Sequence, residues 1–587
     1  MKNRILMTAA ALVLGHAGLS AQNLNPTVEV TRQFEGKLSE IVKQSPQVCI
    51  PDTLRRFNLD FDYSVFSKPY SGSYDFNPYL LDNRPLPEKL EETSLWLRAG
   101  AGYSIYPTLD FVWNPKKLRN DFRMDIYGSH HSYVGKYRAV GYTDQVLDKT
   151  GSLWDGYDMD SRLGVDGRYD WSGGYLSFDL AYQGFHSMEE MLRQVGKSNY
   201  NSAEASLRIV QKDDSRNHVV YGGSLSYRFV NDKLDCSPDP VAGNEFEFDI
   251  TGGYSLNRRH AFLAELKNEN AFYSYLNCPY AGSVSINPKY VFSYDRWHIN
   301  LGAKFSNTYS GDQEMPAERT GGRHIYPDLK VSFAAVWDGM EIYAKAGGGD
   351  NINSYSSIKK NNHFAASWLD PEMYMDNSFD LLDSRLGIAG SMFSRRLSYD
   401  IGGGYRKVEN HLFMPVYFNG EHTSAGLPCY GDMSAYNASA RLSWKSERLA
   451  ATAGFEWEAA TPAQPELPVL LPSEYKADAS FSYRWGARVT AGLKVEYASA
   501  MKGLICGPEV LLTGDEESEL PEEPGEVPVL DARVPYFVDL GFDFDFKVNS
   551  RLSLWVSGGN LLNMTIQRTP LVAERGINFT IGATLRL

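Results

Sequence analysis

The chain has 587 residues, a formal net charge of −14 and 13% aromatic residues, including 37 tyrosines and 11 tryptophans. The negative charge disfavours nucleic acid as a partner, because a phosphate backbone requires a basic protein face. After Ala21 no apolar stretch approaches the roughly 20 residues that a membrane-spanning helix needs. Abundant aromatic residues with a negative mean hydropathy are typical of a transmembrane β-barrel, in which only alternate residues face lipid.

A soluble all-β protein is the competing class. A soluble chain of this length would normally divide into several domains of roughly 100–200 residues, joined by linkers. We recognise no such linker in the sequence, so the barrel class is favoured.

The N-terminal residues have the layout of a secretory signal. Lys2 and Arg4 precede the apolar run Ile5–Leu14, and the segment after this run ends in the small residue Ala21. This pattern predicts a signal peptide over residues 1–21. No cysteine directly follows the cleavage site, so we expect no lipid anchor.

The first strand is expected after a short leading segment, residues 22–56. Apolar and polar residues alternate from Phe57 to Val65, as in a strand with one apolar and one polar face. From here we predict one barrel domain over residues 57–587. About ten tight turns between alternating segments predict hairpins, at residues 114–118, 172–174, 212–217, 257–260, 295–297, 338–339, 394–396, 445–448, 486 and 549–550.

Together with the first and last strands, these hairpins make about 22 strands, an even number as single-chain bacterial barrels require. The connections between hairpins are longer and irregular, at residues 67–92, 135–159, 310–323, 353–380, 411–433 and 501–532. Short turns at one end and long loops at the other are typical of outer-membrane barrels, with both termini on the periplasmic side. The sequence therefore predicts an all-β fold, a large closed antiparallel transmembrane barrel in the outer membrane of a Gram-negative bacterium, surrounded by outer-membrane lipid.

The predicted inner face of the barrel is polar. Five charged residues are expected to point to the face opposite to that of their apolar neighbours in the same strand: Asp60, Asp62, Arg98, Arg123 and Asp125. Mixed charges suit a water-filled interior or a polar filling rather than an oily ligand cavity. We therefore take these five residues as candidate substrate contacts in the lumen.

The five cysteines, an odd number, leave at least one unpaired in an exported protein. Cys236, Cys278, Cys429 and Cys506 fall in predicted outside loops and are candidate disulfide cysteines. Free thiols are the equally favoured alternative. Cys49 precedes the barrel, and no pair has the spacing of a zinc site, so we expect no metal.

Three further patterns have ordinary explanations. The acidic stretch 513–526 suits a divalent cation or a cationic partner, but its two prolines and lack of calcium-loop spacing favour a solvated loop. No helix pattern opens directly after the glycines at 347–349, so a glycine-rich strand end or bulge is favoured over a phosphate site. His130 and His131 have no serine or aspartate at legible spacing, so we expect no enzyme activity and no cofactor.

The last residues alternate without interruption. Ile577, Phe579, Ile581, Ala583, Leu585 and Leu587 alternate with polar or small residues up to the end of the chain. Such a strand would be an unpaired edge in a soluble protein, whereas in a closed barrel it pairs with the first strand.

The C-terminal strand resembles the signal that the barrel-assembly machinery reads, with Thr580, Gly582, Leu585 and Leu587 at its key positions. That resemblance implies the assembly machinery as a partner during insertion. Ser557–Asn563 and Arg575–Phe579 resemble the last strand pair of TonB-dependent receptor barrels, and the strand count extends this resemblance to the whole predicted barrel. It implies transport of a solute through the outer membrane.

One departure from these receptors bears on mechanism. They carry an N-terminal plug domain of well over a hundred residues and a TonB-binding box, whereas residues 22–56 are too few for a plug. Because a 22-stranded barrel without filling would leak, we expect inserted loops, the N-terminal segment or a separate protein to close the lumen. The leading hypothesis is a transporter or channel for solute uptake. The alternative is a non-transporting scaffold subunit of an outer-membrane complex.

Overall fold

The computed structural model describes residues 94–103, 106–115, 121–188, 197–212, 218–234, 240–257, 259–274, 280–311, 322–336, 339–361, 376–414, 416–418, 423–425, 429–465, 467–506 and 529–587. All of them belong to one compact unit, Pro69–Leu587. Within these residues, no helix has the length and apolar character needed to cross a bilayer.

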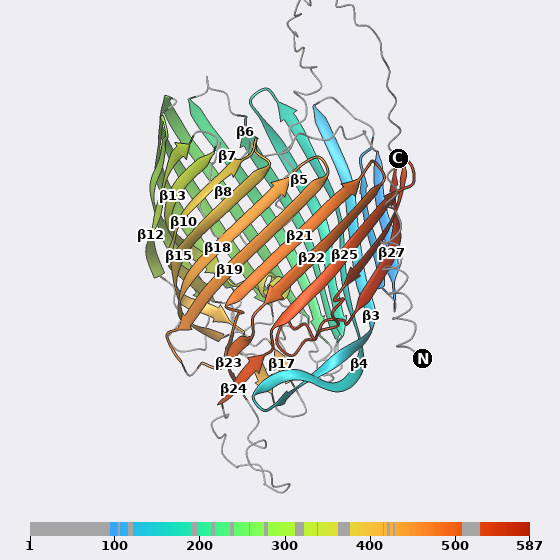
Figure 1. Ribbon diagram of the computed structural model, residues 1–587. Coiled ribbons are helices and arrows are strands. Elements are labelled where there is room, and N and C mark those ends of the chain that lie inside the picture. Colours follow the sequence, from blue (N-terminus) through green and yellow to red (C-terminus); the bar gives the residue numbers. More distant parts are fainter. Residues whose placement is uncertain are drawn as a thin grey trace, which may run out of the picture. The chain divides into compact units, whose positions relative to one another are not determined.

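The described residues form a closed antiparallel barrel of 22 strands (Figure 1). The first eleven are β1 (Leu95–Gly102), β2 (Tyr106–Trp113), β3 (Phe122–Thr143), β4 (Val146–Trp171), β5 (Gly174–Met188), β6 (Lys197–Gln211), β7 (Val219–Leu234), β8 (Val241–Asn257), β9 (His260–Ser274), β10 (Tyr280–Tyr294) and β11 (Trp297–Gly311). The other eleven are β12 (Gly322–Val336), β13 (Met340–Ile352), β14 (Asn377–Met392), β15 (Leu397–Phe413), β18 (Cys429–Lys445), β19 (Leu449–Pro462), β21 (Tyr475–Trp485), β22 (Val489–Ala498), β25 (Phe537–Lys547), β26 (Leu552–Gly559) and β27 (Asn578–Arg586).

The barrel closes where the C-terminal strand β27 pairs with β1. The register runs from Trp96 opposite Arg586 to Gly102 opposite Thr580. The amides of Ser94 and Leu95 donate to the carbonyl of Leu587, so both ends of the described barrel lie at one rim. The predicted pairing of the C-terminal strand with residues 57–65 is wrong, because β27 is already bonded to β1 on one side and to β26 on the other. Residues 57–65 themselves lie outside the described residues.

Six of the ten predicted tight turns are described in full, at residues 172–174, 295–297, 394–396, 445–448, 486 and 549–550. Each lies between consecutive barrel strands, at the rim that carries the C-terminus. The other rim carries the long connections, and one of them differs from the prediction. Residues 135–159 are not an irregular loop, because β3 and β4 continue as a paired ribbon and turn only between Thr143 and Val146. Polar and glycine residues obscure the alternation there, although the backbone pairing persists.

Short elements fold inside the long connections. They are α2 (Tyr355–Asn361) between β13 and β14, and the strands β16 (Val416–Phe418), β17 (Thr423–Ala425), β20 (Leu470–Leu471), β23 (Met501–Cys506) and β24 (Val529–Val534). Strand β23 is central, because it pairs with β16, β20 and β24. A single parallel bridge, Arg533 to Val146, joins this small sheet to the end of β4.

The outer face of the barrel is apolar. Large side chains such as Leu180, Leu225 and Leu301 are 52%, 41% and 46% exposed, a pattern that suits contact with lipid chains. Towards the long-loop rim, tyrosines on this face donate to asparagines, as Tyr182 does to Asn201. Tyr–Asn pairs of this kind place a polar, aromatic border where the apolar band ends.

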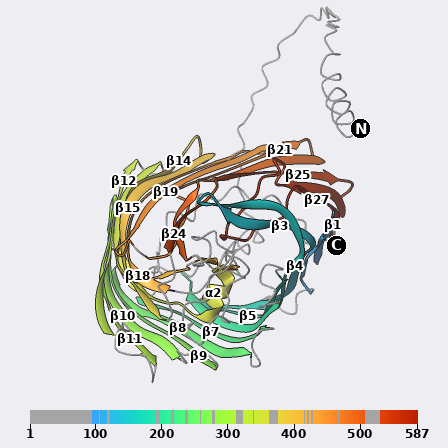
Figure 2. The same cartoon turned by 90° about the horizontal axis from the view of Figure 1, so that it is seen from below.

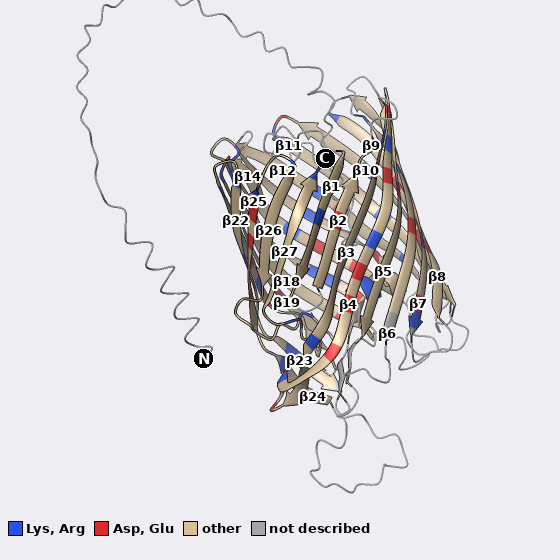
Figure 3. Cartoon of the chain, turned by 90° about the vertical axis from the view of Figure 1, so that its right-hand side faces the viewer, with Lys and Arg blue, Asp and Glu red and all other residues tan. Residues whose placement is uncertain are grey.

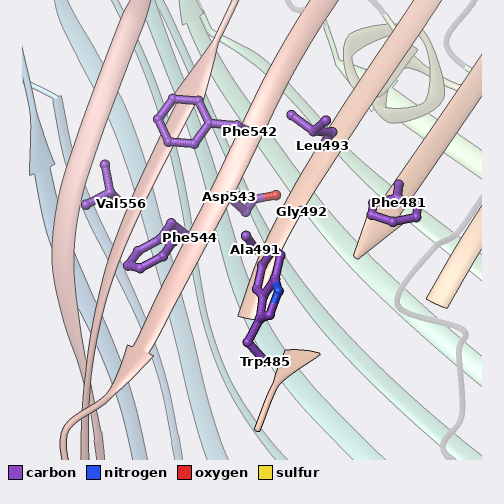
Figure 4. A pocket seen from close by; sticks show the side chains of 9 residues that line it. All are labelled: Phe481, Trp485, Ala491, Gly492, Leu493, Phe542, Asp543, Phe544 and Val556. Carbon is purple, nitrogen blue, oxygen red and sulfur yellow. The ribbon is translucent and has the colours of Figure 1, made fainter. Parts of the chain in front are cut away.

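A shallow groove on the outer face is lined by apolar residues apart from Asp543 (Figure 4). Its lipid-facing side chains come from four neighbouring strands and include Phe481, Leu493, Phe544 and Val556, above the small residue Ala491. The groove therefore suits a lipid acyl chain, and the polar site of this protein must be sought in the lumen.

A charge on the outer face should destabilise the barrel. We expect Leu225→Arg to lower the free energy of unfolding by about 2–4 kcal/mol, the cost of an arginine near the bilayer midplane. The adjacent lumen variant Ser226→Arg should cost much less, because Ser226 lies opposite Glu247 on the inner face. Urea-dependent folding into phospholipid vesicles measures both values. Equal losses for the two variants would contradict the assignment of faces.

Candidate functional site: the lumen and its loop cover

Charged residues of both signs are distributed along the strands of the wall (Figure 3). On one side Asp125, Asp166 and Asp179 lie directly opposite one another across β3, β4 and β5. Asp179 accepts a hydrogen bond of 2.7 Å from the Tyr127 hydroxyl and lies 3.6 Å from Arg162. This part of the wall presents more acidic than basic groups to the lumen.

Another part of the wall, formed by β9, β10 and β12, holds a buried ion cluster. Lys289 Nζ lies 2.7 Å from Glu265 and 2.9 Å from Asp328, and its side chain is 6% exposed. Asn287 donates to the same Asp328 carboxylate at 2.7 Å. Because the charges of this cluster are satisfied within it, it stiffens the wall rather than offering a free binding site.

The predicted lumen residues fall as follows. Arg98 lies opposite Asp110 and Thr584, with its guanidinium 4.2 Å from the ring centre of Trp555. Arg123 and Asp125 lie on β3, opposite Arg168 and Asp166. These residues share the inner face. Asp60 and Asp62 lie outside the described residues.

Helix α2 is folded back onto the wall near the long-loop rim (Figure 2). The Tyr355 hydroxyl donates to Asp232 at 2.7 Å, and Lys359 Nζ lies 3.2 Å from the same carboxylate. The Ser356 hydroxyl donates to Glu245, which also binds Arg228 at 2.6 Å.

Further contacts extend the attachment of α2. Lys360 Nζ lies 3.0 Å from Glu204. Burial lowers the pKa of Lys360, with nearby Arg228 adding to this effect and Glu204 opposing it. Ile358 packs in an apolar cluster with Phe185, Tyr200 and other wall residues. The helix is therefore held by several buried polar and apolar contacts at once.

The β26–β27 connection, residues 560–577, is a second inward element, which we call the strap. Arg568 forms ion pairs with Glu496, Asp539 and Glu574. Burial raises the pKa of the Glu574 carboxyl, while the positive charge of Arg568 opposes that rise.

The strap also contacts the first strands of the barrel. Arg575 donates to the Tyr106 hydroxyl at 2.7 Å, and its guanidinium lies 3.9 Å from the centre of the same ring. From the other direction, Arg138 on β3 donates to Asn563 at 2.6 Å. The strap thus contacts strands on both sides of the β27–β1 seam: β22 and β25 on one side, and β2 and β3 on the other.

The paired ends of β3 and β4, residues 133–156, form the third inward element, which we call the ribbon. It arches across one end of the barrel (Figure 2). Pairing of β2 with β3 ends at His131, and pairing of β5 with β4 ends at Tyr157. Beyond these points the ribbon has no neighbouring wall strand.

The tip of the ribbon is fastened by few hydrogen bonds. The Arg533 amide donates to the Gln145 carbonyl at 2.9 Å, and the Tyr142 hydroxyl donates to the Asp531 carbonyl at 2.8 Å. The buried Gln567 side chain of the strap donates to the Leu147 carbonyl at 2.9 Å. The ribbon is thus held at its tip by β24 and the strap.

An apolar cluster, which we call the latch, accompanies these hydrogen bonds. It combines ribbon, small-sheet and strap residues: Val140, Leu147, Met501, Ile505, Ala532, Val534, Leu571 and Ala573. Val140, Leu147, Ile505 and Ala573 are fully buried. The latch gives the long-loop rim a small hydrophobic core of its own.

Two glycines face each other at the base of the ribbon. Gly135 lies opposite Gly156, just beyond the last residues that pair with the wall. A Cβ at Gly156 would lie 2.1 Å from the Trp154 ring, so only glycine fits there. Glycine on both strands leaves no side chains to pack across the pair, which weakens the pairing at this point.

The remaining sequence candidates are distributed as follows. Cys429 begins β18 and packs near Phe413, and Cys506 ends β23. Cys236, Cys278 and the acidic stretch 513–526 lie outside the described residues, so the disulfides remain a prediction. A register shift between Gly347 and Gly349 confirms the predicted bulge.

The two predicted histidines make ordinary polar contacts. His130 bonds to Ser161 and Ser132, and His131 bonds to Asp110. Among the described residues, no three histidine, cysteine or acidic side chains are grouped as a metal would require. The strap and the latch were not predicted, because no local pattern marks contacts between such distant residues.

No family model and no curated protein matches the sequence. Solved structures do match. The FrpB iron transporter of Neisseria meningitidis has a TM-score of 0.61 at 9% identity, over 85% of this chain and 82% of its own. The siderophore receptor PirA of Acinetobacter baumannii has a TM-score of 0.59 at 9% identity, over 85% and 81%. The copper transporter OprC has a TM-score of 0.58 at 10% identity, over 86% and 82%.

This chain has the fold of a TonB-dependent receptor barrel. The fold places it in the outer membrane of a Gram-negative bacterium. The matches cover 85–86% of this chain. This fraction is close to that of the residues from Ser94 to Leu587, which contain the barrel. With the fold known, the long-loop rim that carries α2, the strap and the ribbon is extracellular, and the C-terminal rim is periplasmic.

Removing the carboxylate that anchors α2 should release the helix. Asp232 is fully buried, accepts a hydrogen bond from Tyr355 and pairs with Lys359, so Asp232→Ala should cost about 3–5 kcal/mol of local stability by breaking a buried ion pair. Hydrogen exchange of residues 355–361 measures the loss. The exposed turn variant Asp295→Asn is the control, and unchanged protection in both would contradict the proposed anchoring.

Proposed function

We propose that this protein is a transporter for solute uptake across the outer membrane, resembling a TonB-dependent receptor barrel without the plug. The solute passes through the lumen, and the ribbon is its extracellular gate. One observation carries this proposal: the ribbon leaves the wall at a glycine pair and is fastened at its tip to the strap and the small sheet. A segment attached in this way can open without disturbing the barrel.

The lumen chemistry supports a polar or charged solute. Charges of both signs line the wall, and the candidate contacts Arg98 on β1 and Arg123 and Asp125 on β3 lie on the two strands that flank β2. Iron, siderophore and copper transporters share the fold, which favours transport as the use of the lumen. The identity of the solute does not follow from this likeness.

The absence of an internal plug is part of the proposal. The sequence suggests a leader over residues 1–21 and a short segment over 22–56, and each matched transporter keeps part of its own chain outside the match. Closure of the lumen then falls to the extracellular loops, with a separate protein at the periplasmic rim. Outer-membrane lipid and, during insertion, the barrel-assembly machinery are the other expected partners.

A scaffold subunit is the second candidate. The latch gives the extracellular rim a packed core, which would also suit a permanently closed surface for binding other proteins. In that case the ribbon would never open.

Locking the ribbon should separate the two candidates. The double variant Val146→Cys/Arg533→Cys joins two bridged positions and should form a disulfide between ribbon tip and β24. We expect the oxidised protein to show several-fold lower conductance in planar bilayers than the reduced protein.

The control Lys136→Cys/Asp155→Cys places a disulfide within the ribbon, between β3 and β4, without tying the ribbon to β24. Its conductance should be the same in both redox states. Conductance that does not change on locking would exclude the ribbon as the gate, and a barrel silent in every state would favour the scaffold.

A further inference from the structure

Basic residues face one another at four places on the periplasmic rim, at successive boundaries between one hairpin and the next. Backbone bonds of 2.7–2.8 Å join Lys445 to Arg396, Arg484 to Arg448, Lys547 to Arg488, and Arg586 to Arg551. We call these eight residues the collar. They extend from β15 to β27, over eight of the 22 barrel strands, about a third of the rim.

The described remainder of the same rim has no such pairs. The corresponding bonds join Ala334 to Arg296, Ser293 to Arg259, and Asp170 to Asp121. The chain as a whole has a net charge of −14, so its overall charge does not explain the collar. The positive charge is concentrated at one place by the order of the strands.

Strand alternation places the collar on the lumen side of the wall. Lys445 follows Trp444, and Lys547 follows Phe546, both of which are on the lipid face. Arg448, Arg488 and Arg551 are exposed residues in or beside the turns. The collar therefore borders the periplasmic opening of the lumen, and the lipid-facing side of the same rim is aromatic.

Like charges directly opposite one another destabilise a sheet. Four consecutive cation pairs therefore carry an electrostatic cost that an anionic partner would offset, and their summed field would attract such a partner. The collar spans eight neighbouring strands, an arc of roughly 34 Å at the usual strand spacing. This length exceeds a small solute and matches about ten residues of extended chain.

We propose that the collar is a docking surface for an acidic, extended segment of a periplasmic protein. The arc length favours a polypeptide over a single solute anion, and the lumen-side placement disfavours the headgroups of the inner leaflet. A protein seated here would cover the periplasmic opening. The inference depends on the orientation of the barrel and holds whether or not the barrel transports.

The probe is a fluorescent peptide of ten glutamates, titrated onto the full-length protein in uncharged detergent. We expect saturable binding that the ten-glutamine peptide lacks. The variant Arg488→Gln/Lys547→Gln should weaken binding by about tenfold, because it removes one facing pair of charges. The control Arg259→Gln/Arg296→Gln removes two charges from the same rim outside the collar and should leave binding unchanged.

Heat-dependent migration on gels shows whether each variant is folded, and Arg448→Gln/Arg551→Gln replaces the collar variant if it is not. Equal affinities of the collar and control variants, or equal binding of both peptides, would overturn the proposal. A third outcome would also overturn it. In that outcome short-chain phosphatidylglycerol displaces the acidic peptide from the wild type, and the collar variant no longer binds this lipid, so that the collar would be a lipid site. Failure here leaves the disulfide test of the gate unaffected.

Discussion

Backbone hydrogen bonding in hydrocarbon is the constraint on which this structure depends. A sheet inside a bilayer cannot leave an edge open, because unsatisfied amides and carbonyls are costly where no water reaches them. The pairing of β27 with β1 removes the last edge. It also brings Leu587 next to Ser94, so that both ends of the barrel share one rim. The separation of an apolar outer face from a charged lumen follows from this closure and from strand alternation.

The two rims then take different roles. At the extracellular rim, α2, the strap and the ribbon fold inward and bury their own polar and apolar contacts. At the periplasmic rim the hairpins are short, and the unusual feature is the collar of facing cations. The two proposals follow this division, with the gate assigned to the loop-covered rim and the docking surface to the collar.

Much of the wall could be predicted from local pattern. The turns at 172–174 and 549–550 are where polar and glycine residues interrupt the alternation, and both join adjacent strands. The ribbon was mistaken for a loop because glycine and charged residues hide the alternation beyond His131. The anchoring of α2 could not be predicted either, since Tyr355 and Asp232 are distant in sequence and their bond depends on the curvature of the wall.

The sequence by itself determined the class of the protein: two-residue periodicity, short turns and an unbroken C-terminal strand admit few folds other than a membrane barrel. The tertiary structure alone decided which strand closes the ring, which loops cover the opening, and where cations from separate hairpins meet. The physical reason is range. Alternation and turn chemistry act between neighbours in the chain, whereas the Gln567–Leu147 bond and the Lys547–Arg488 pairing exist only after distant segments have been brought together.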